Sequence, residues 1–391
     1  MAVAFWFLLP AQCYHGGSFF EAIGEDLQTI SNASNVINAD VLDAWFPPSP
    51  RVIAAMQENM PWLLQTSPPT HAAGLEDAIA KARGVNITSV LASAGSSDLI
   101  FLALQNLLNK NSRVLVVDPC YGEYLHVLQH IIHCHVQRFS LHREEGFCLN
   151  AEELVGEIGN GYDMVILVNP NSPTGVYTEK EKLISVLRKV PASSLVWIDE
   201  TYVEYIGASV SLETFAAASE NIVVCKSMSK VYALSGARAA YLCAPPHLLE
   251  KLRSLSPPWS VSLPAQLAAI EALKDSAYYE EMYSQTHELC KQLFDDLKSL
   301  GITNIIPGCA NFLLFFLPEN ISAEAFVGRC REKQLYLRTV ENLSRSLTNG
   351  VRIAVKDELS NRRMLKIISE TMESMSCRGL KADFDTRVHS V

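Results

Sequence analysis

Residues 227–238 read Ser227-Met228-Ser229-Lys230-Val231-Tyr232-Ala233-Leu234-Ser235-Gly236-Ala237-Arg238. They follow a short apolar run at residues 222–225 that is typical of a buried strand. Two hydroxyl side chains stand just before Lys230, and Arg238 stands eight residues after it. Hydroxyls and a guanidinium suit an anion such as phosphate, so the segment predicts a lysine that works beside a bound anion. The alternative is an ordinary surface lysine that follows a buried strand.

Two other strand-like runs also end in polar residues. Residues 195–198 lead into Asp199 and, three residues later, Tyr202, whereas residues 164–168 lead into Asn169-Pro170-Asn171-Ser172-Pro173-Thr174-Gly175. Two prolines and a glycine predict a sharp irregular turn in that second segment. Parallel strands bring their carboxyl ends to one edge of a sheet, where doubly wound α/β proteins bind ligands. We therefore expect Asp199 near Lys230, although an acid after a strand can also cap the next helix.

The chain also carries a candidate phosphate cradle and a candidate aromatic lid. Gly95-Ser96-Ser97 lies between a strand-like run at residues 90–92 and an apolar helix expected at residues 98–109. Backbone N–H groups at a helix N-terminus bind phosphate readily, although serine there is also an ordinary N-cap. Tyr121 follows a strand expected at residues 113–117, where it either covers a flat ring or packs against its neighbours.

Together these segments resemble the fold-type-I pyridoxal-phosphate enzymes of the aspartate aminotransferase superfamily. The resemblance rests on S-x-S-K-x-x-x-L-x-G-x-R around Lys230, on D-x-x-Y at Asp199, and on N-P-x-N-P-T-G, whose last Asn is Ser172 here. It implies that Lys230 carries pyridoxal 5'-phosphate covalently and serves as general base, while Asp199 faces the pyridine nitrogen. It also implies cofactor contacts from Tyr202 and either Asn171 or Ser172 at the 3-oxygen, from Tyr121 on the ring, and from Gly95, Ser96, Ser97, Ser227, Ser229 and Arg238 around the phosphate.

Three segments resemble the substrate-binding parts of histidinol-phosphate aminotransferases and threonine-phosphate decarboxylases. His15-Gly16-Gly17 is similar to the opening of the decarboxylases, and Leu335-Tyr336-Leu337-Arg338 with Gly350-Val351-Arg352-Ile353-Ala354-Val355-Lys356 is similar to a paired-arginine segment. The resemblance implies that Arg352 grips a substrate carboxylate, that Arg338 meets a second anionic group, and that His15 and Gly17 contact substrate. Alternatively, either arginine pairs with an internal acid.

Two departures from these relatives concern the substrate. The relatives carry Tyr-Pro-Asp before the first large-domain helix, and that Tyr reaches the cofactor phosphate of the neighbouring subunit. Residues 65–75 lack the tyrosine, which leaves His71 or Ser67 as its replacement, and a second segment is altered at residues 31–38. Because both segments touch substrate in the relatives, we expect a substrate that neither named class of enzyme uses.

Composition argues against several other classes. The 391 residues carry a net charge of −10 without a basic run, which argues against nucleic-acid binding. The ten cysteines lack C-x-x-C pairs and are typical of reduced thiols in the cytoplasm, and His133-Cys134-His135 lacks zinc-site spacing, so we expect no metal. The apolar residues 4–9 follow no basic segment and are too short to span a bilayer, so we expect neither a signal peptide nor a membrane anchor.

Strand-like and helix-like runs alternate from about residue 90 to residue 243, which predicts an α/β fold. We expect an N-terminal arm at residues 1–50 and a large domain at residues 51–275, whose mostly parallel seven-stranded sheet is covered by helices. A long helix at residues 278–300 would lead into a smaller α+β domain at residues 276–391, with a frayed tail after residue 378.

We predict an aminotransferase that acts on an amino acid or amino phosphate as a homodimer, because sites of this superfamily lie across a dimer interface. Decarboxylation of an O-phospho amino acid uses the same residues and stays open, as does γ-replacement or cyclisation. A non-catalytic pyridoxal-phosphate sensor is a further alternative, although no helix-turn-helix domain precedes the fold to support it.

Overall fold

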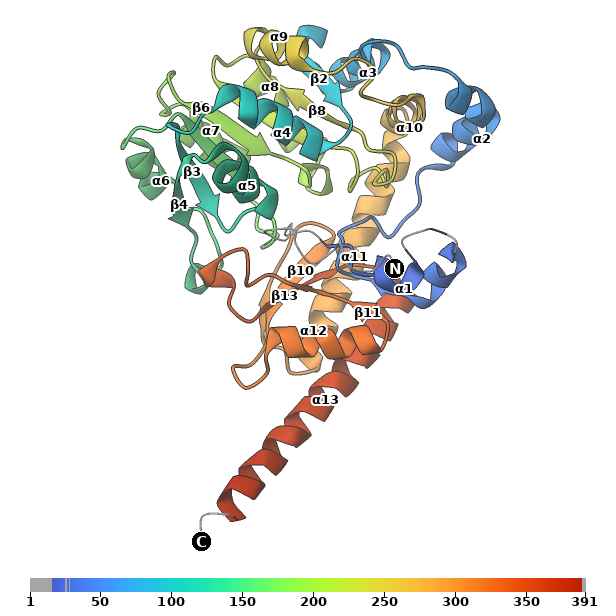
Figure 1. The fold of residues 1–391 in the computed structure, drawn as a ribbon, viewed down its shortest axis with the longest axis vertical. Coiled ribbons are helices and arrows are strands. Elements are labelled where there is room, and N and C mark those ends of the chain that lie inside the picture. Colours follow the sequence, from blue (N-terminus) through green and yellow to red (C-terminus); the bar gives the residue numbers. More distant parts are fainter. Residues whose placement is uncertain (1–15, 25–26, 28, 389–391) are drawn as a thin grey trace, which may run out of the picture.

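The computed structural model describes residues 16–24, 27 and 29–388, with side chains described as far as residue 375. Figure 1 shows a larger part built around a sheet, a smaller part beside it, and a C-terminal helix that extends away from both.

The larger part contains a seven-stranded sheet. In the order of the chain its strands are β2 (Val90–Ser93), β3 (Arg113–Asp118), β4 (His135–Ser140), β5 (Met164–Val168), β6 (Leu195–Asp199), β7 (Ile222–Ser227) and β8 (Ala240–Cys243). Their order across the sheet is β2-β8-β7-β6-β5-β3-β4. Only β8 runs antiparallel to its neighbours, so β2 to β7 all point the same way.

Helices cover both faces of this sheet because both faces are apolar. Along β5, Met164 and Ile166 pack with α4 (Ser96–Leu107), α5 (Gly122–His126) and α9 (Pro246–Leu255), whereas Val165 and Leu167 pack with α6 (Ala151–Ile158), α7 (Lys180–Leu187) and α8 (Glu213–Ala217). Successive side chains of a strand point to opposite faces, and a sheet buried on both sides therefore reads as a continuous apolar run.

The smaller part is built on a four-stranded antiparallel sheet of order β12-β13-β10-β9. Its strands are β9 (Asn304–Ile306), β10 (Phe312–Phe316), β12 (Arg338–Thr339) and β13 (Gly350–Ala354), and its helices are α11 (Ser276–Ser299), α12 (Ala323–Glu332) and α13 (Glu358–Val388).

The N-terminal segment crosses onto this smaller part. It contains α1 (Phe20–Ile23) and β1 (Ile37–Asn38), and β1 pairs in parallel with β11 (Leu335–Tyr336). The chain then returns to the larger part through α2 (Pro50–Gln65) and α3 (Ala73–Arg83), which pack against α10 (Leu263–Leu273) in one apolar core. The pairing of β1 with β11 places residues 39–43 beside the end of β13.

The seven-stranded, mostly parallel sheet and the long helix that leads from it are confirmed. The frayed tail expected after residue 378 is wrong, because α13 continues to Val388. The helix expected at residues 123–132 changes to a π-helix at Val127–Ile132.

Candidate active site

The carboxyl ends of the parallel strands open into one pocket, which holds about 590 Å³ of empty space counted out to its mouth. Its walls come from the ends of β5, β6 and β7 and from the segments that follow β2, β3, β5, β6 and β7. The lining residues are Ser96, Ser97, Tyr121, Val168, Ser172, Asp199, Thr201, Tyr202, Ser227, Ser229, Lys230 and Arg238. The fold thus brings together, from distant parts of the chain, most of the residues that the sequence pattern singles out.

Lys230 lies just beyond the end of β7, with a side chain that is 20% exposed. Its Nζ lies 2.8 Å from Oδ1 of Asp43 and donates a second hydrogen bond of 3.4 Å to Oγ of Ser235. Burial lowers the pKa of the Lys230 amine, and the charge of Asp43 offsets this only in part. A lowered pKa brings a lysine closer to the neutral amine that proton abstraction needs.

Asp199 ends β6 and is fixed by hydrogen bonds on both carboxylate oxygens. Oδ1 accepts from the backbone N–H of Thr201 at 2.9 Å and from its hydroxyl at 2.7 Å. Oδ2 accepts from the hydroxyl of Tyr124 at 2.7 Å, and that hydroxyl accepts in turn from Nε1 of Trp197 at 2.8 Å. Burial raises the pKa of Asp199 above its usual value, while these hydrogen bonds favour the carboxylate.

The pocket also contains a candidate anion cradle, formed by the start of α4 and Arg238. Gly95, with φ +108°, precedes the first turn of α4, so the free N–H groups of Ser96 and Ser97 lie at the helix N-terminus. A Cβ at Gly95 would lie 2.4 Å from Nη2 of Arg238, so only glycine leaves room for this guanidinium. Nη1 of Arg238 in turn donates to Oγ of Ser229 at 3.5 Å.

The turn after β5 separates the two candidates for contact with the cofactor's 3-oxygen. Asn171 donates Nδ2 to the backbone oxygen of Pro119 at 2.9 Å and accepts from the Thr174 hydroxyl at 2.8 Å, so its side chain braces the turn. Ser172 instead lies on the pocket wall with Tyr202. Tyr121 lines the same wall and donates to Glu123 at 2.8 Å.

The two arginines of the small domain face each other. Arg338 on β12 is paired directly with Arg352 on β13, and such partners lie on the same face of an antiparallel sheet. Nη2 of Arg352 donates to the backbone oxygen of Asp40 at 3.1 Å, while its buried Nε has no hydrogen-bond partner. Burial and the charge of Arg338 lower the pKa of Arg352. Among the described residues, no carboxylate lies within ion-pair distance of Arg352, so the alternative of an internal acid partner does not hold for it there.

Other predicted residues lie elsewhere. Gly17 donates its N–H to Oδ2 of Asp40 at 2.8 Å, and His15 lies outside the described residues. Ser67 and His71 are exposed between α2 and α3 and do not line the pocket of their own chain. Within the part of the chain that the structure describes, no three His, Cys, Asp or Glu side chains are grouped to hold a metal ion.

Two charged residues near Lys230 were missed from the sequence. Asp43 comes from the segment between β1 and α2, and Lys356 follows β13 and donates to the backbone oxygen of Asp43 at 3.5 Å. Lys356 was quoted only as the end of the paired-arginine segment. Nothing in the local sequence marks Asp43, because its contact spans 187 positions.

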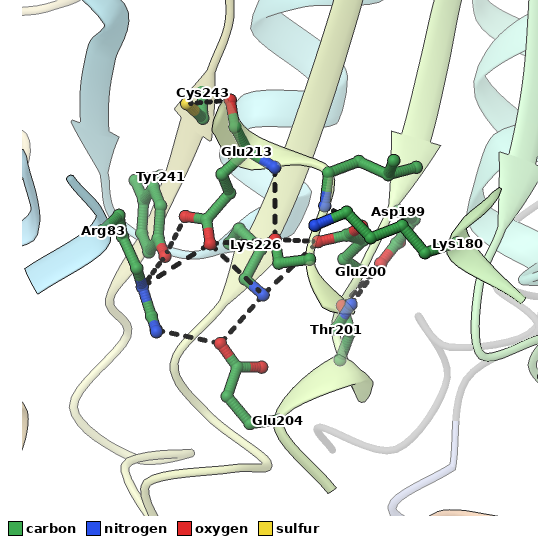
Figure 2. A network of polar contacts seen from close by, with 12 residues as sticks. Arg83, Lys180, Asp199, Glu200, Thr201, Glu204, Glu213, Lys226, Tyr241 and Cys243 are labelled. Atoms are coloured by element: carbon green, nitrogen blue, oxygen red, sulfur yellow. Dashed lines mark hydrogen bonds and ion pairs between the residues drawn. The ribbon is translucent and has the colours of Figure 1, made fainter. Parts of the chain in front are cut away.

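A second buried network lies beside the pocket (Figure 2). Lys226 on β7 lies 2.8 Å from Glu204, and Arg83 of α3 lies 2.9 Å from the same carboxylate oxygen. Glu200, the residue after Asp199, and Glu213 complete the network. Three carboxylates thus share two cations, and burial raises the pKa of Glu200 to about 7.

The fold is a doubly wound α/β fold that places a lysine, a buried acid and a candidate anion cradle at the carboxyl edge of its sheet. The family model described as "Aminotransferase class I and II" matches residues 35–368. The chain therefore belongs to the class I and II aminotransferases, and it is a pyridoxal-phosphate-dependent aminotransferase. The family, the enzyme class and the cofactor expected from the sequence are confirmed.

Known relatives are similar over most of the chain. The histidinol-phosphate aminotransferase of Staphylococcus epidermidis is 28% identical over 327 residues, which cover 83% of this chain and 88% of that one. Histidinol-phosphate aminotransferase 1 of Bacillus cereus is 29% identical over 305 residues, which cover 78% of this chain and 80% of that one.

Solved structures show the same fold. The histidinol-phosphate aminotransferase of Clostridium acetobutylicum has a TM-score of 0.79 at 24% identity and covers 87% of this chain and 100% of that one. The enzyme of Sinorhizobium meliloti, in complex with pyridoxal-5'-phosphate, has a TM-score of 0.79 at 19% identity, covering 88% and 94%. The L-threonine-O-3-phosphate decarboxylase of Porphyromonas gingivalis has a TM-score of 0.76 at 20% identity, covering 86% and 100%.

The pocket fits pyridoxal phosphate at both ends. The helix N-terminus at Ser96 and the guanidinium of Arg238 form a cradle that a side chain at Gly95 would fill. At the other end stands a buried carboxylate, Asp199, with a lysine amine on the same pocket wall. When bound, pyridoxal phosphate supplies an electron-withdrawing ring to the bonds at the substrate's α-carbon.

Proposed function

We propose that the protein transfers the amino group of a small substrate that carries an anionic group for Arg352 and a second one for Arg338. The observation that carries this proposal is the facing pair of guanidinium groups, one of which has a buried, unpartnered Nε. A guanidinium keeps its charge over the accessible pH range and matches a carboxylate or phosphate with paired hydrogen bonds. Two adjacent cations favour a substrate with two anionic groups, or one doubly charged group.

The other pocket residues take the roles that their surroundings support. Lys230 holds the cofactor and moves the proton at the α-carbon, a role that its lowered pKa favours. Asp199 faces the pyridine nitrogen and stays ionised through the hydrogen bonds of Thr201 and Tyr124. Ser172 and Tyr202 contact the 3-oxygen, Tyr121 covers the ring, and the phosphate lies among Gly95, Ser96, Ser97, Ser227, Ser229 and Arg238.

An amino phosphate is the substrate class that the relatives support. The curated relatives quoted above are named histidinol-phosphate aminotransferases, and a phosphate would meet both Arg338 and Arg352. The altered segment at residues 65–75 distinguishes this chain from those relatives, so we infer an amino phosphate or acidic amino acid other than histidinol phosphate.

We also infer a homodimer whose interface includes α2. This helix exposes Ile53, Trp62 and Leu64, α9 exposes its last residue, Leu255, and the turn after α9 exposes Trp259. The N–H of Trp259 bonds the oxygen of Thr70, which ties that turn to the segment after α2. Ser67 and His71 lie in the same segment, where a partner's pocket could receive them. Large exposed apolar side chains are more often found at protein interfaces than elsewhere on a surface.

We place the enzyme in the cytoplasm. The eight cysteines whose side chains the structure describes are free thiols, which favours a reducing compartment. Among the described helices, none is both long and apolar enough to cross a membrane.

Product analysis tests the proposed reaction. The protein loaded with pyridoxal phosphate is incubated with phosphoserine, phosphothreonine and glutamate, each paired with an analogue that lacks its second anionic group. Histidinol phosphate, whose one phosphate is doubly charged, is paired with histidinol. We expect the visible absorption to fall as the cofactor takes up the amino group, with a keto product and a clear preference for the doubly anionic member of a pair. Release of carbon dioxide without a keto product would instead establish decarboxylation, and equal rates within the pairs would contradict the role of the two arginines.

A further inference from the structure

Asp43 is held rigidly against Lys230 by the small domain. Four backbone oxygens of residues 39–43 accept hydrogen bonds from residues in or beside β10 and β13. The donors are the N–H of Ala354 to Ala39 at 3.0 Å, Arg352 to Asp40 at 3.1 Å, Asn311 to Leu42 at 2.9 Å, and Lys356 to Asp43 at 3.5 Å. The Asp43 carboxylate is therefore built into the site, 2.8 Å from the Lys230 amine.

The backbone of Lys356 is also fixed by hydrogen bonds. Its backbone N–H donates to Oδ1 of Asn361 at 2.9 Å, and Nδ2 of Asn361 donates back to the Lys356 oxygen at 2.8 Å. The Lys230 amine therefore bonds the Asp43 carboxylate, whereas the Lys356 amine bonds the backbone oxygen of the same residue and acts on the carboxylate through its charge. Burial lowers the pKa of Lys356 to about 8, and the charge of Lys230 acts in the same direction while Asp43 opposes it.

The arrangement matters because Lys230 changes its state when the cofactor binds. A partly buried carboxylate is destabilised when it loses the cation that it contacts. Lys356 gives Asp43 a second nearby positive charge, which remains when the Lys230 nitrogen is engaged. The other charged groups that face this cluster in the described residues are Arg238, Arg352 and Asp357.

We propose that Asp43 and Lys356 are positioning residues for Lys230: Asp43 orients the amine and keeps it protonated in the free site, and Lys356 keeps a positive charge near Asp43 once the cofactor has taken up that amine. The inference rests on the proposed role of Lys230. Asp43 and Lys356 should therefore shift the pKa of Lys230 in opposite directions, because Asp43 brings a negative charge and Lys356 a positive one.

Titration of Lys230 with and without cofactor tests the inference. In the cofactor-free protein, competitive acetylation over a pH series, read by peptide mass spectrometry, measures the pKa of the Lys230 amine. In the loaded protein without substrate, the visible absorption over the same series measures the protonation of the lysine–cofactor linkage. We expect Asp43→Asn to lower both pKa values by about one pH unit or more, and Lys356→Met to raise both.

Matched variants separate this role from a structural one. Asp77→Asn and Lys81→Met disrupt an exposed lysine–aspartate pair of 2.6 Å and should leave Lys230 unchanged. Lys356→Arg keeps the charge and should titrate like the wild type. Shifts of equal sign in Asp43→Asn and Lys356→Met, or no shift in either, would overturn the inference. A wild-type protein that stays colourless with added cofactor would contradict the proposed function, and the acetylation series would still decide the inference.

Discussion

Arg352 is the residue whose environment constrains the substrate most. It lies on β13, beside Arg338 of β12 and against the backbone of Asp40. The buried Nε of Arg352 has no hydrogen-bond partner, which costs free energy, and under the proposed function an anionic substrate would remove that cost. Substrate binding and cation burial are therefore linked at this side chain.

Arg352→Gln should reduce kcat/KM for anionic substrates by about 10- to 100-fold, since a hydrogen bond to a charged group contributes about 1.5–3 kcal/mol. The absorption of the bound cofactor should not change, because Arg352 does not line the cofactor pocket. Steady-state kinetics with paired substrates check both points, with Arg331→Gln, on the exposed side of α12, as the control. Unaltered kinetics would place the substrate anion elsewhere.

At this scale the sequence predicted those site residues that lie within short segments. Lys230, Ser229 and Arg238 share one twelve-residue stretch, and Asp199 follows an apolar run, so local spacing placed them on the same pocket. The choice between Asn171 and Ser172 depended on which side chain braces the turn, which only the fold shows. Asp43 reaches Lys230 through a pairing of β1 with β11 that no local pattern encodes.

Among the elements, β6 and β7 join the pocket to the buried network of Figure 2. Asp199 and Glu200 are adjacent, as are Lys226 and Ser227, so each strand end supplies one residue to the pocket and one to the network. The network consists of three buried carboxylates and two buried cations. Because it holds one more carboxylate than cations, its stability depends on pH.

Glu200 should make the protein less stable as the pH rises from about 4.5 to about 7. Its pKa in the folded state is raised from 4.5 to about 7, so its favourable contribution is complete below about 4.5 and is lost as the pH rises through 7. At about 1.4 kcal/mol for each pH unit, the effect is on the order of 3 kcal/mol. Urea unfolding of Glu200→Gln over this range should show a flatter pH profile than the wild type.

The exposed Glu152→Gln serves as the control for this measurement, because Glu152 lies at the start of α6 in solvent. Parallel profiles for the wild type and Glu200→Gln would mean that the network does not hold the proton.

The order of elements was predictable where apolar runs are long. Most strands of the seven-stranded sheet are apolar runs, and the edge strand β4 (HVQRFS) is the exception. By contrast, β11 and β12 contain two residues each and have no readable period. The end of α13 was misjudged because Gly379 lies in a charged stretch. One glycine costs only about 1 kcal/mol in a helix, and the segment contains no proline to end it.

For the whole molecule, the proposed dimer is the feature with the largest consequence. Replacing Trp62 and Leu64 on α2 with glutamate and lysine should shift the protein to a monomer and reduce activity at least tenfold, since residues 65–75 would no longer reach the neighbouring pocket. Analytical ultracentrifugation with parallel activity measurements checks this. Leu359→Lys alters an equally exposed leucine on α13 and should leave the assembly unchanged. A wild-type monomer with full activity would contradict the proposed interface.

The central claim is that the ε-amino group of Lys230 joins the cofactor. Reduction of the loaded protein with borohydride fixes that bond, and peptide mass spectrometry then locates it. The account predicts the label on Lys230 alone and none in Lys230→Ala. A label on Lys356 or Lys226, or undiminished labelling of Lys230→Ala, would contradict it.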